Sequence, residues 1–168
     1  MIGRTAGPQP PKFLSRVREL CAGAATLDGR ILRGTLMATV LLVEEDDQVR
    51  VLAESYLEEQ GHEVLSAGTA PGALALLAKT SQLELLFTNV DLKGEIAAGI
   101  ALARDAVNRS PNLKVLYTTK RNLTDGMKAR FVKNSAFLPK PYTVEQLLTT
   151  LSVHFRISPQ ARRQRVTV

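Results

Sequence analysis

The sequence predicts an α/β fold of three layers, in which a parallel sheet of five strands is covered by helices on both faces. Short, nearly continuous apolar runs alternate with longer segments whose apolar residues recur at helical spacing. Runs of this kind are typical of strands buried on both faces. Because the alternation repeats along the chain, right-handed crossovers make the strands parallel, and we expect the flavodoxin-like strand order 2-1-3-4-5.

The strands are expected where apolar residues gather between turn-forming residues. The first, 40–43, is wholly apolar, whereas the second, 63–66, is more polar and therefore suits an edge of the sheet. The remaining three are expected at 83–88, 113–117 and 136–138.

Amphipathic segments follow the strands. Asp47 is expected to cap the first helix, which ends at Gly61. Thr69 and Pro71 open the second helix, and Pro111 stops the third. The residues expected to face inward are Val49, Leu52, Ala53, Tyr56 and Leu57 in the first helix, Ala70, Ala73, Leu74, Leu77 and Ala78 in the second, and Leu102, Ala103, Ala106 and Val107 in the third.

The last two helices differ in the strength of their patterns. Residues 122–133 carry a thin apolar stripe interrupted by Gly126, so this fourth helix is the weakest element. Thr143 and Gln146 form a capping box for the fifth helix. The residues expected to be buried in it are Val144, Leu147, Leu148, Leu151 and Phe155.

Basic residues are concentrated at the two ends of the chain. The net charge of +6 divides into +4 for residues 1–36, −2 for 37–155 and +4 for 156–168. We therefore expect a flexible basic extension over 1–36, one domain over 37–157 and a flexible basic tail over 158–168. Alternatively, residues 1–36 result from translation that starts at an upstream codon, and they have no role. The tail has three arginines without aromatic residues between them, which favours a solvated segment over a nucleic-acid or membrane contact.

Composition also narrows the class of protein. Cys21 is the only cysteine, so no internal disulfide forms and a reducing cytoplasm is the expected setting. One cysteine and two histidines exclude a Cys/His metal cluster. No apolar run approaches the roughly 18 residues that span a bilayer.

Polar residues follow four of the predicted strands. In an open parallel sheet, function gathers at the carboxyl ends of the strands, where the strand order reverses. Glu45 and Asp46 follow the first strand, and Asn89 follows the third. Thr118 and Lys140 follow the fourth and fifth strands. We expect these side chains to converge on one small polar pocket.

Four segments carry a resemblance to a known family. They are Val-Glu-Glu-Asp-Asp-Gln-Val-Arg at 43–50, Leu-Leu-Phe-Thr-Asn-Val at 85–90, Lys-Val-Leu-Tyr-Thr-Thr at 114–119 and Leu-Pro-Lys-Pro-Tyr at 138–142. In this order and on these strand ends, residues 39–155 resemble the receiver domain of two-component response regulators. The second segment resembles Leu-Leu-Phe-Thr-Asp-Val, a form found in receivers attached to or partnering hybrid sensor kinases, in which the aspartate accepts a phosphoryl group.

The resemblance implies a role for each residue at the strand ends. Glu45 and Asp46 match the acidic pair that binds Mg²⁺, and the backbone carbonyl of Asp91 matches a further metal ligand. Asn89 takes the place of the accepting aspartate and would be at most a weak metal ligand.

Three further positions match residues that respond to phosphorylation. Lys140 matches the lysine that pairs with the accepting carboxylate and then with the phosphoryl group. Thr118 matches the hydroxyl that bonds a phosphoryl oxygen, and Phe137 matches the aromatic switch position without a hydroxyl. Lys93 and Lys120 replace residues usual in the family, so the loops have changed together with the acceptor.

Two classes of function follow from these residues. A neutral amide at position 89 is not a nucleophile, which favours an atypical receiver that binds Mg²⁺ weakly and acts by protein–protein interaction. The expected partners are a histidine kinase, a phosphotransfer protein or another receiver, through the face of the fourth helix, fifth strand and fifth helix, which would also serve a homodimer. The alternative is an active receiver with Asp91 as phosphoacceptor.

Other activities lack the required segments. No nucleotide-binding glycine loop or hydrolase motif is present, so we do not expect an enzyme. The 13 residues from Arg156 onward are too few for a helix-turn-helix, so nucleic-acid binding is not expected.

Overall fold

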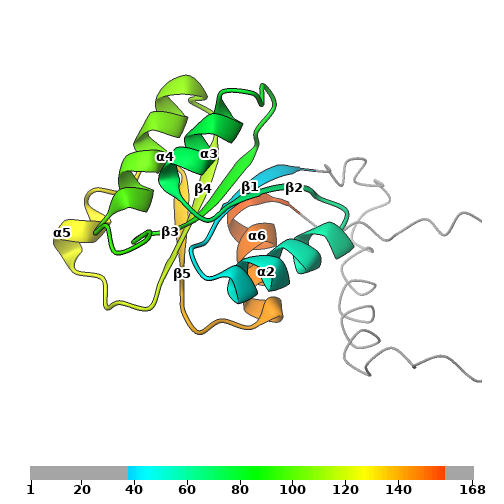
Figure 1. The fold of residues 1–168 in the computed structure, drawn as a ribbon. Helices are drawn as coiled ribbons and strands as arrows, with labels where there is room; N and C mark the ends of the chain where they lie inside the picture. The colour runs from blue at the N-terminus through cyan, green and yellow to red at the C-terminus, as the bar shows by residue number, and fades with distance from the viewer. Residues whose placement is uncertain (1–37, 158–168) are drawn as a thin grey trace, which may run out of the picture. The chain divides into compact units, whose positions relative to one another are not determined.

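The computed structural model describes residues 38–157, which form a parallel sheet of five strands with helices on both faces (Figure 1). The strand order is β2-β1-β3-β4-β5, which confirms the predicted fold class. The strands are β1 Thr39–Val43, β2 Glu63–Ala67, β3 Leu85–Asn89, β4 Lys114–Thr119 and β5 Ser135–Pro139. The predicted basic extension (1–36) and tail (158–168) lie outside the described residues.

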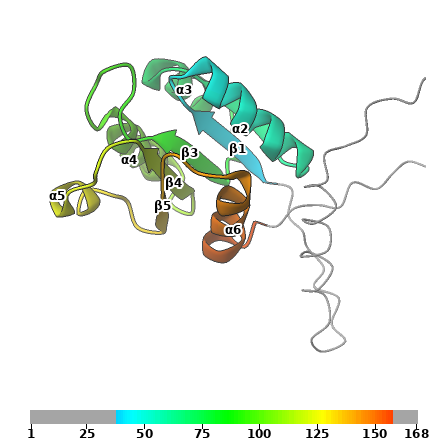
Figure 2. The same ribbon diagram turned by 90° about the horizontal axis from the view of Figure 1, so that it is seen from below.

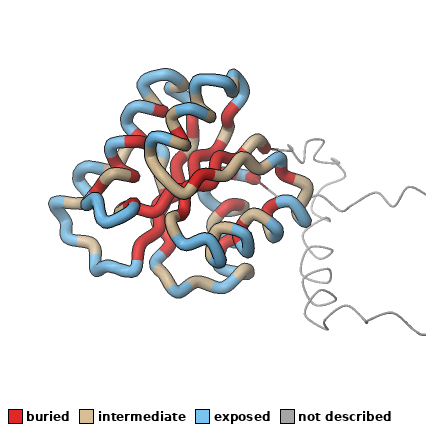
Figure 3. The backbone as a smooth tube through the Cα atoms, in the orientation of Figure 1, coloured by how far each residue is buried: buried red, intermediate tan, exposed pale blue. Residues whose placement is uncertain are grey.

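Two apolar clusters fill the space on the two sides of the sheet. Figure 2 shows helices on both sides of the sheet, and Figure 3 shows that the buried residues gather along the central strands. Leu41 and Val43 of β1 belong to the cluster beneath α3 and α4, whereas Val40 and Leu42 belong to the cluster beneath α2 and α6. This division follows from the alternation of side chains along a strand. The helices are α2 Asp47–Glu59, α3 Ala70–Leu77, α4 Ala98–Arg109, α5 Asp125–Lys128 and α6 Val144–Phe155.

Side-chain caps begin three of the longer helices. Thr69 accepts a hydrogen bond from the amide of Gly72 (3.1 Å), and Thr143 and Gln146 form the predicted capping box. The expected cap of the first helix is wrong by one residue. Asp46, not Asp47, accepts from the amides that open α2, at 3.0 and 3.2 Å. Asp46 has the extended backbone that a cap requires, whereas Asp47 already lies in the helix.

Only part of the predicted α2 stripe is buried. Ala53 and Leu57 pack against the sheet, Val49 and Tyr56 are half-buried, and Leu52 is 57% exposed. At 100° per residue, Leu52 lies roughly 120° around the helix from the line between Ala53 and Leu57. The side chain of Leu52 therefore does not point into the core beneath α2. Ala78, also expected to face inward, is exposed because α3 ends at Leu77.

The fourth helix is much shorter than expected. Of residues 122–133, only Asp125–Lys128 are helical. The thin apolar stripe explains the difference, because it gives a helix little to bury and includes Gly126. Phe131 lies beyond α5 and stacks on Tyr117 of β4, with ring centroids 4.0 Å apart. Aromatic packing, rather than a long helix, covers this part of the sheet.

Candidate functional site

Four polar side chains lie at the carboxyl ends of the strands, on the side covered by α2 and α6. Two residues before each of them lies a buried residue of the α2–α6 cluster (Leu42, Phe87, Leu116 and Leu138). Since side chains two positions apart share a face, the four residues share that side. We call Glu44, Asn89, Thr118 and Lys140 the strand-end pocket.

A buried ion pair forms one half of this pocket. The ammonium of Lys140 donates to Oε2 of Glu44, and the two side chains are 6% and 3% exposed. The other carboxylate oxygen of Glu44 accepts from the amide of Asp46 at 3.2 Å. Lys140, predicted to pair with an accepting carboxylate, thus has a carboxylate partner from β1 instead of from position 89. The pattern of the acidic run 44–47 singled out Glu45 and Asp46 rather than Glu44, although Glu44 follows Leu42 by two positions and so shares its face.

Two buried oxygen atoms without hydrogen bonds form the other half. Asn89 and Thr118 are paired in the register of β3 and β4. Oδ1 of Asn89 and Oγ1 of Thr118 are buried, and neither has a hydrogen-bond partner among the described residues. A buried polar group left unpaired costs about 1–3 kcal/mol. These atoms therefore mark the place where the pocket has hydrogen-bonding capacity left for a small polar ligand or water.

A close backbone contact fixes the position of Asn89. The amide of Gly99, in the first turn of α4, donates to the carbonyl of Val90 at 2.9 Å. A Cβ atom at position 99 would lie 1.8 Å from the carbonyl oxygen of Asn89. Only glycine allows α4 to approach the end of β3 this closely.

The predicted metal-binding carboxylates already accept hydrogen bonds. Oε2 of Glu45 accepts from the amide of Lys93. Asp46 is exposed and caps α2, and the hydrogen bond from the amide of Val49 is the main cause that lowers its pKa. Asp91 was predicted to bind through its backbone carbonyl, and its side-chain Oδ1 accepts from the amide of Ala97 at 2.9 Å.

The side-chain oxygen atoms at this edge of the sheet are poorly suited to bind Mg²⁺. Hard oxygen ligands are present at Glu45 and Asn89, but Lys140 and the amide of Lys93 compete for the anionic oxygens of this edge. No group of three or more His, Cys, Asp or Glu residues within 38–157 is arranged to hold a metal. Weak Mg²⁺ binding by these residues stays a prediction.

The two predicted switch residues lie on different sides of the sheet. Thr118 belongs to the strand-end pocket. Phe137 belongs to the cluster beneath α3 and α4, where its ring lies 6.4 Å from that of Phe131. Neighbouring Thr119 accepts from the amide of Arg121 at 3.1 Å.

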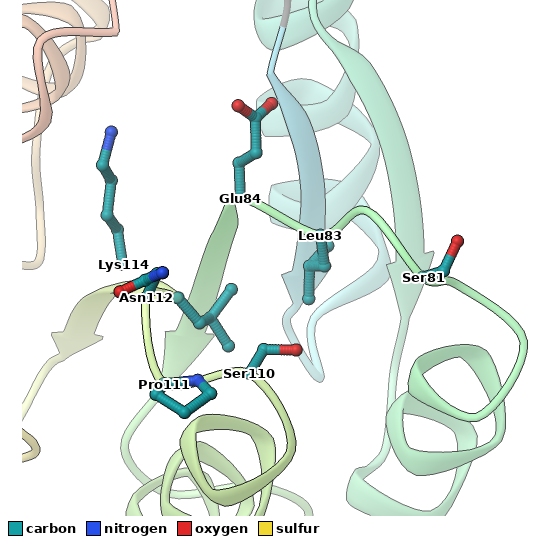
Figure 4. A pocket seen from close by; sticks show the side chains of 8 residues that line it. Ser81, Leu83, Glu84, Ser110, Pro111, Asn112 and Lys114 are labelled. Atoms are coloured by element: carbon teal, nitrogen blue, oxygen red, sulfur yellow. The ribbon is translucent and has the colours of Figure 1, made fainter.

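A second hollow, of about 320 Å³, lies at the opposite edge of the sheet (Figure 4). Its charged residues are Glu84 and Lys114. The carboxylate of Glu84 accepts from the amide of Thr39 at 3.1 Å, and the ammonium of Lys114 donates to the carbonyl of Phe155 at 2.7 Å. Glu84 thus holds the start of β1 and Lys114 holds the end of α6, so both charged groups of this hollow have structural partners. Within the part of the chain that the structure describes, no helix is long and apolar enough to cross a membrane.

Comparison with known proteins gives a consistent result. The model of the response regulator receiver domain matches residues 40–152. The chain is 30% identical over 118 residues to the transcriptional regulatory protein AruR of Pseudomonas aeruginosa, which covers 68% of this chain and 48% of AruR. With YrkP of Bacillus subtilis also matched over 49% of its length, the chain spans about half the length of these curated relatives.

Solved structures agree with this match. A response regulator receiver protein from Sinorhizobium medicae has a TM-score of 0.63 at 23% identity, over 72% of this chain and 96% of that chain. The receiver domain of the hybrid histidine kinase CckA has a TM-score of 0.58 at 25% identity, over 70% and 98% of the two chains. The family model covers well over half of the residues, and the observed strand order is that of its fold. The chain therefore belongs to the response regulator receiver domain family of two-component signalling.

Proposed function

We propose that this chain is an atypical receiver that does not accept a phosphoryl group at position 89 and signals by protein–protein interaction. The observation that carries the proposal is the combination of Asn89 at the end of β3 with a buried ion pair between Lys140 and Glu44. A carboxamide is not a nucleophile for phosphoryl transfer. The lysine that would neutralise an acceptor already has a carboxylate partner.

Asp91 is the alternative acceptor. Its Oδ1 accepts from the amide of Ala97, and its Oδ2 lies 3.5 Å from Nη1 of Arg121. To attack a phosphoryl donor, the carboxylate would have to give up contacts that order the loop before α4. These contacts favour a structural role for Asp91 over catalysis.

Mg²⁺ has a reduced role in this proposal. Glu45, Asp46, Asn89 and the backbone carbonyl of Asp91 are the residues that would hold it. The bound ion would supply positive charge where anions meet. With Asp46 capping α2 and an amide at position 89, we expect weak binding.

The expected partners are a histidine kinase, a phosphotransfer protein or another receiver. The predicted surface of fourth helix, fifth strand and fifth helix corresponds to α5, β5 and α6, of which α5 is a single turn. Val153 on the outer side of α6 is 70% exposed, so α6 presents an apolar contact residue. A homodimer through this face belongs to the same proposal, as do a cytoplasmic setting and the domain boundaries at 37 and 157.

The experiment is affinity capture from native lysate with the full chain as bait, scored for these three classes of partner. Capture is expected to be the same with and without acetyl phosphate and Mg²⁺, because no phosphoryl group is accepted. Val153→Glu should weaken capture, whereas Ile96→Glu serves as a matched control, since Ile96 is also 70% exposed but lies in the loop before α4. Capture that requires acetyl phosphate would contradict the proposal.

A further inference from the structure

A groove of about 440 Å³ runs between α2 and the segment that leads from β5 into α6. One wall is formed by α2 and the other by the start of α6 and the residues before it. We call it the α2–α6 groove, and it is lined by Val49, Leu52, Ala53, Tyr56, Lys120, Lys140, Pro141, Tyr142, Val144 and Leu147. Its lining is mostly apolar, with two lysines that each follow a strand.

The groove explains an exposed leucine. Leu52 is 57% exposed although the helical pattern of α2 marks it as a core residue. In the fold, its side chain lines the groove instead of packing against the sheet. Tyr56 lies one turn further along α2 and also lines the groove. Concave apolar surface of this kind, with few polar groups, is typical of small-molecule sites.

The polar groups of the groove favour an anion. Lys140 is neutralised by Glu44, but Lys120 is exposed and forms no ion pair with any described residue. Asp46 is near enough for both lysines to lower its pKa, yet it does not line the groove and its carboxylate caps α2. Burial, and then the charge of Glu44, raise the pKa of Tyr142 to about 12, so this phenol stays neutral and does not repel an anion.

We propose that the α2–α6 groove binds a small monoanion with an apolar body, of the class of medium-chain fatty acids or aromatic carboxylates. The apolar body would cover Leu52 and Tyr56, and the anionic group would lie at Lys120. The volume of the groove falls within the roughly 300–1,000 Å³ of small-molecule sites. This site is independent of phosphoryl transfer and goes beyond the function proposed above.

The groove is joined to the strand-end pocket through the backbone. Lys120 directly follows β4, which carries Thr118, and Lys140 belongs to both the groove and the pocket. A ligand in the groove therefore contacts the ends of the two strands on which that pocket is built. Binding of a ligand in the groove would therefore act on the strand-end pocket in place of phosphorylation, as the input signal of a receiver that lacks a phosphoacceptor.

The test is a titration of the full-length protein, followed by amide NMR, with three probes that share one alkyl chain: octanoate, octanol and octylammonium. Octanoate is expected to give saturable shifts along α2 and at Tyr142 to Leu147. It should bind about fivefold more tightly than octylammonium, as expected for a single exposed cation. Lys120→Gln should remove this preference while octanol binding stays unchanged.

A matched pair of variants locates the site. Leu52→Glu puts a carboxylate inside the groove and should weaken octanoate binding at least about tenfold. Val51→Glu makes the same change at the neighbouring residue, which is 58% exposed but does not line the groove, and should change binding less than about twofold.

Several results would overturn the proposal. Equal losses in the Leu52 and Val51 variants, or equal affinity for octanoate and octylammonium, would show that the probes bind without using the groove. Absence of saturable binding would do the same. Shifts along α2 that depend on protein concentration without any probe would identify a second copy of the chain as the occupant.

Discussion

Replacing Glu44 by leucine would leave the nearly buried ammonium of Lys140 without its ion-pair partner. Both side chains are nearly excluded from solvent, at 3% and 6% exposure. Removing one partner of a buried ion pair costs about 3–5 kcal/mol. The substitution also removes the acceptor for the amide of Asp46, which contributes about 1 kcal/mol. We therefore expect Glu44→Leu to lower the free energy of unfolding by at least about 3 kcal/mol.

The same reasoning applies to Lys140→Met, which leaves the carboxylate of Glu44 buried and unpaired. The double variant Glu44→Leu/Lys140→Met removes both charges and should be more stable than either single variant, because two apolar side chains of similar volume replace the pair. Urea unfolding of the four proteins gives the coupling energy. Additive losses, or single variants within about 1 kcal/mol of the wild type, would refute the buried pair.

Three further predictions test other parts of the structure. Gly99→Ala should lower stability by at least about 2 kcal/mol, because its Cβ would meet the carbonyl of Asn89. Gly126→Ala, whose Cβ would lie 4.0 Å from Oγ1 of Thr124, should change stability by less than about 1 kcal/mol, and equal effects in urea unfolding would contradict the close contact at Gly99. Burial lowers the pKa of His62 below 6.5, so the folded protein binds a proton less readily than the unfolded chain. Stability is therefore expected to fall as the pH drops below 6.5, and His62→Gln should flatten this dependence in urea unfolding at a series of pH values. Mg²⁺ should bind with a dissociation constant on the order of 1 mM or weaker by amide NMR, and saturation at micromolar concentration would contradict this.

The strands were predictable because three of the five, β1, β3 and β4, lie inside the sheet and are buried on both faces. A residue run such as 40–43 is then apolar without interruption, whereas the more polar run 63–66 marks an edge strand. The crossover rule makes the strands parallel, and 2-1-3-4-5 is one of the common orders for such a sheet. The length of the fourth helix was not predictable, because a thin apolar stripe with one glycine does not show where the helix ends. In the structure α5 ends at Lys128, and Phe131, three residues further on, stacks on Tyr117. Propensity alone does not decide such a case.

The polar residues of the site were predictable as a group but not in their contacts. Their place at strand ends follows from the fold, and the resemblance singled out Asn89 and Lys140. The partner of Lys140 was missed, because Glu44 lies 96 residues away in the chain and a run of acidic residues offers several candidates. Whether Asp46 or Asp47 caps α2 depends on backbone angles at one residue, which sequence patterns do not resolve.

The most direct test of the central claim is the intact mass of the protein after incubation with Mg²⁺ and acetyl phosphate. The wild type is expected to gain no phosphoryl group, because position 89 carries an amide. Asn89→Asp restores a carboxylate beside Glu45 and Lys140 and should become labelled slowly, since Lys140 must leave Glu44. A hydroxylamine-sensitive phosphoryl adduct on the wild type, lost in Asp91→Asn, would contradict the account and identify Asp91 as the acceptor.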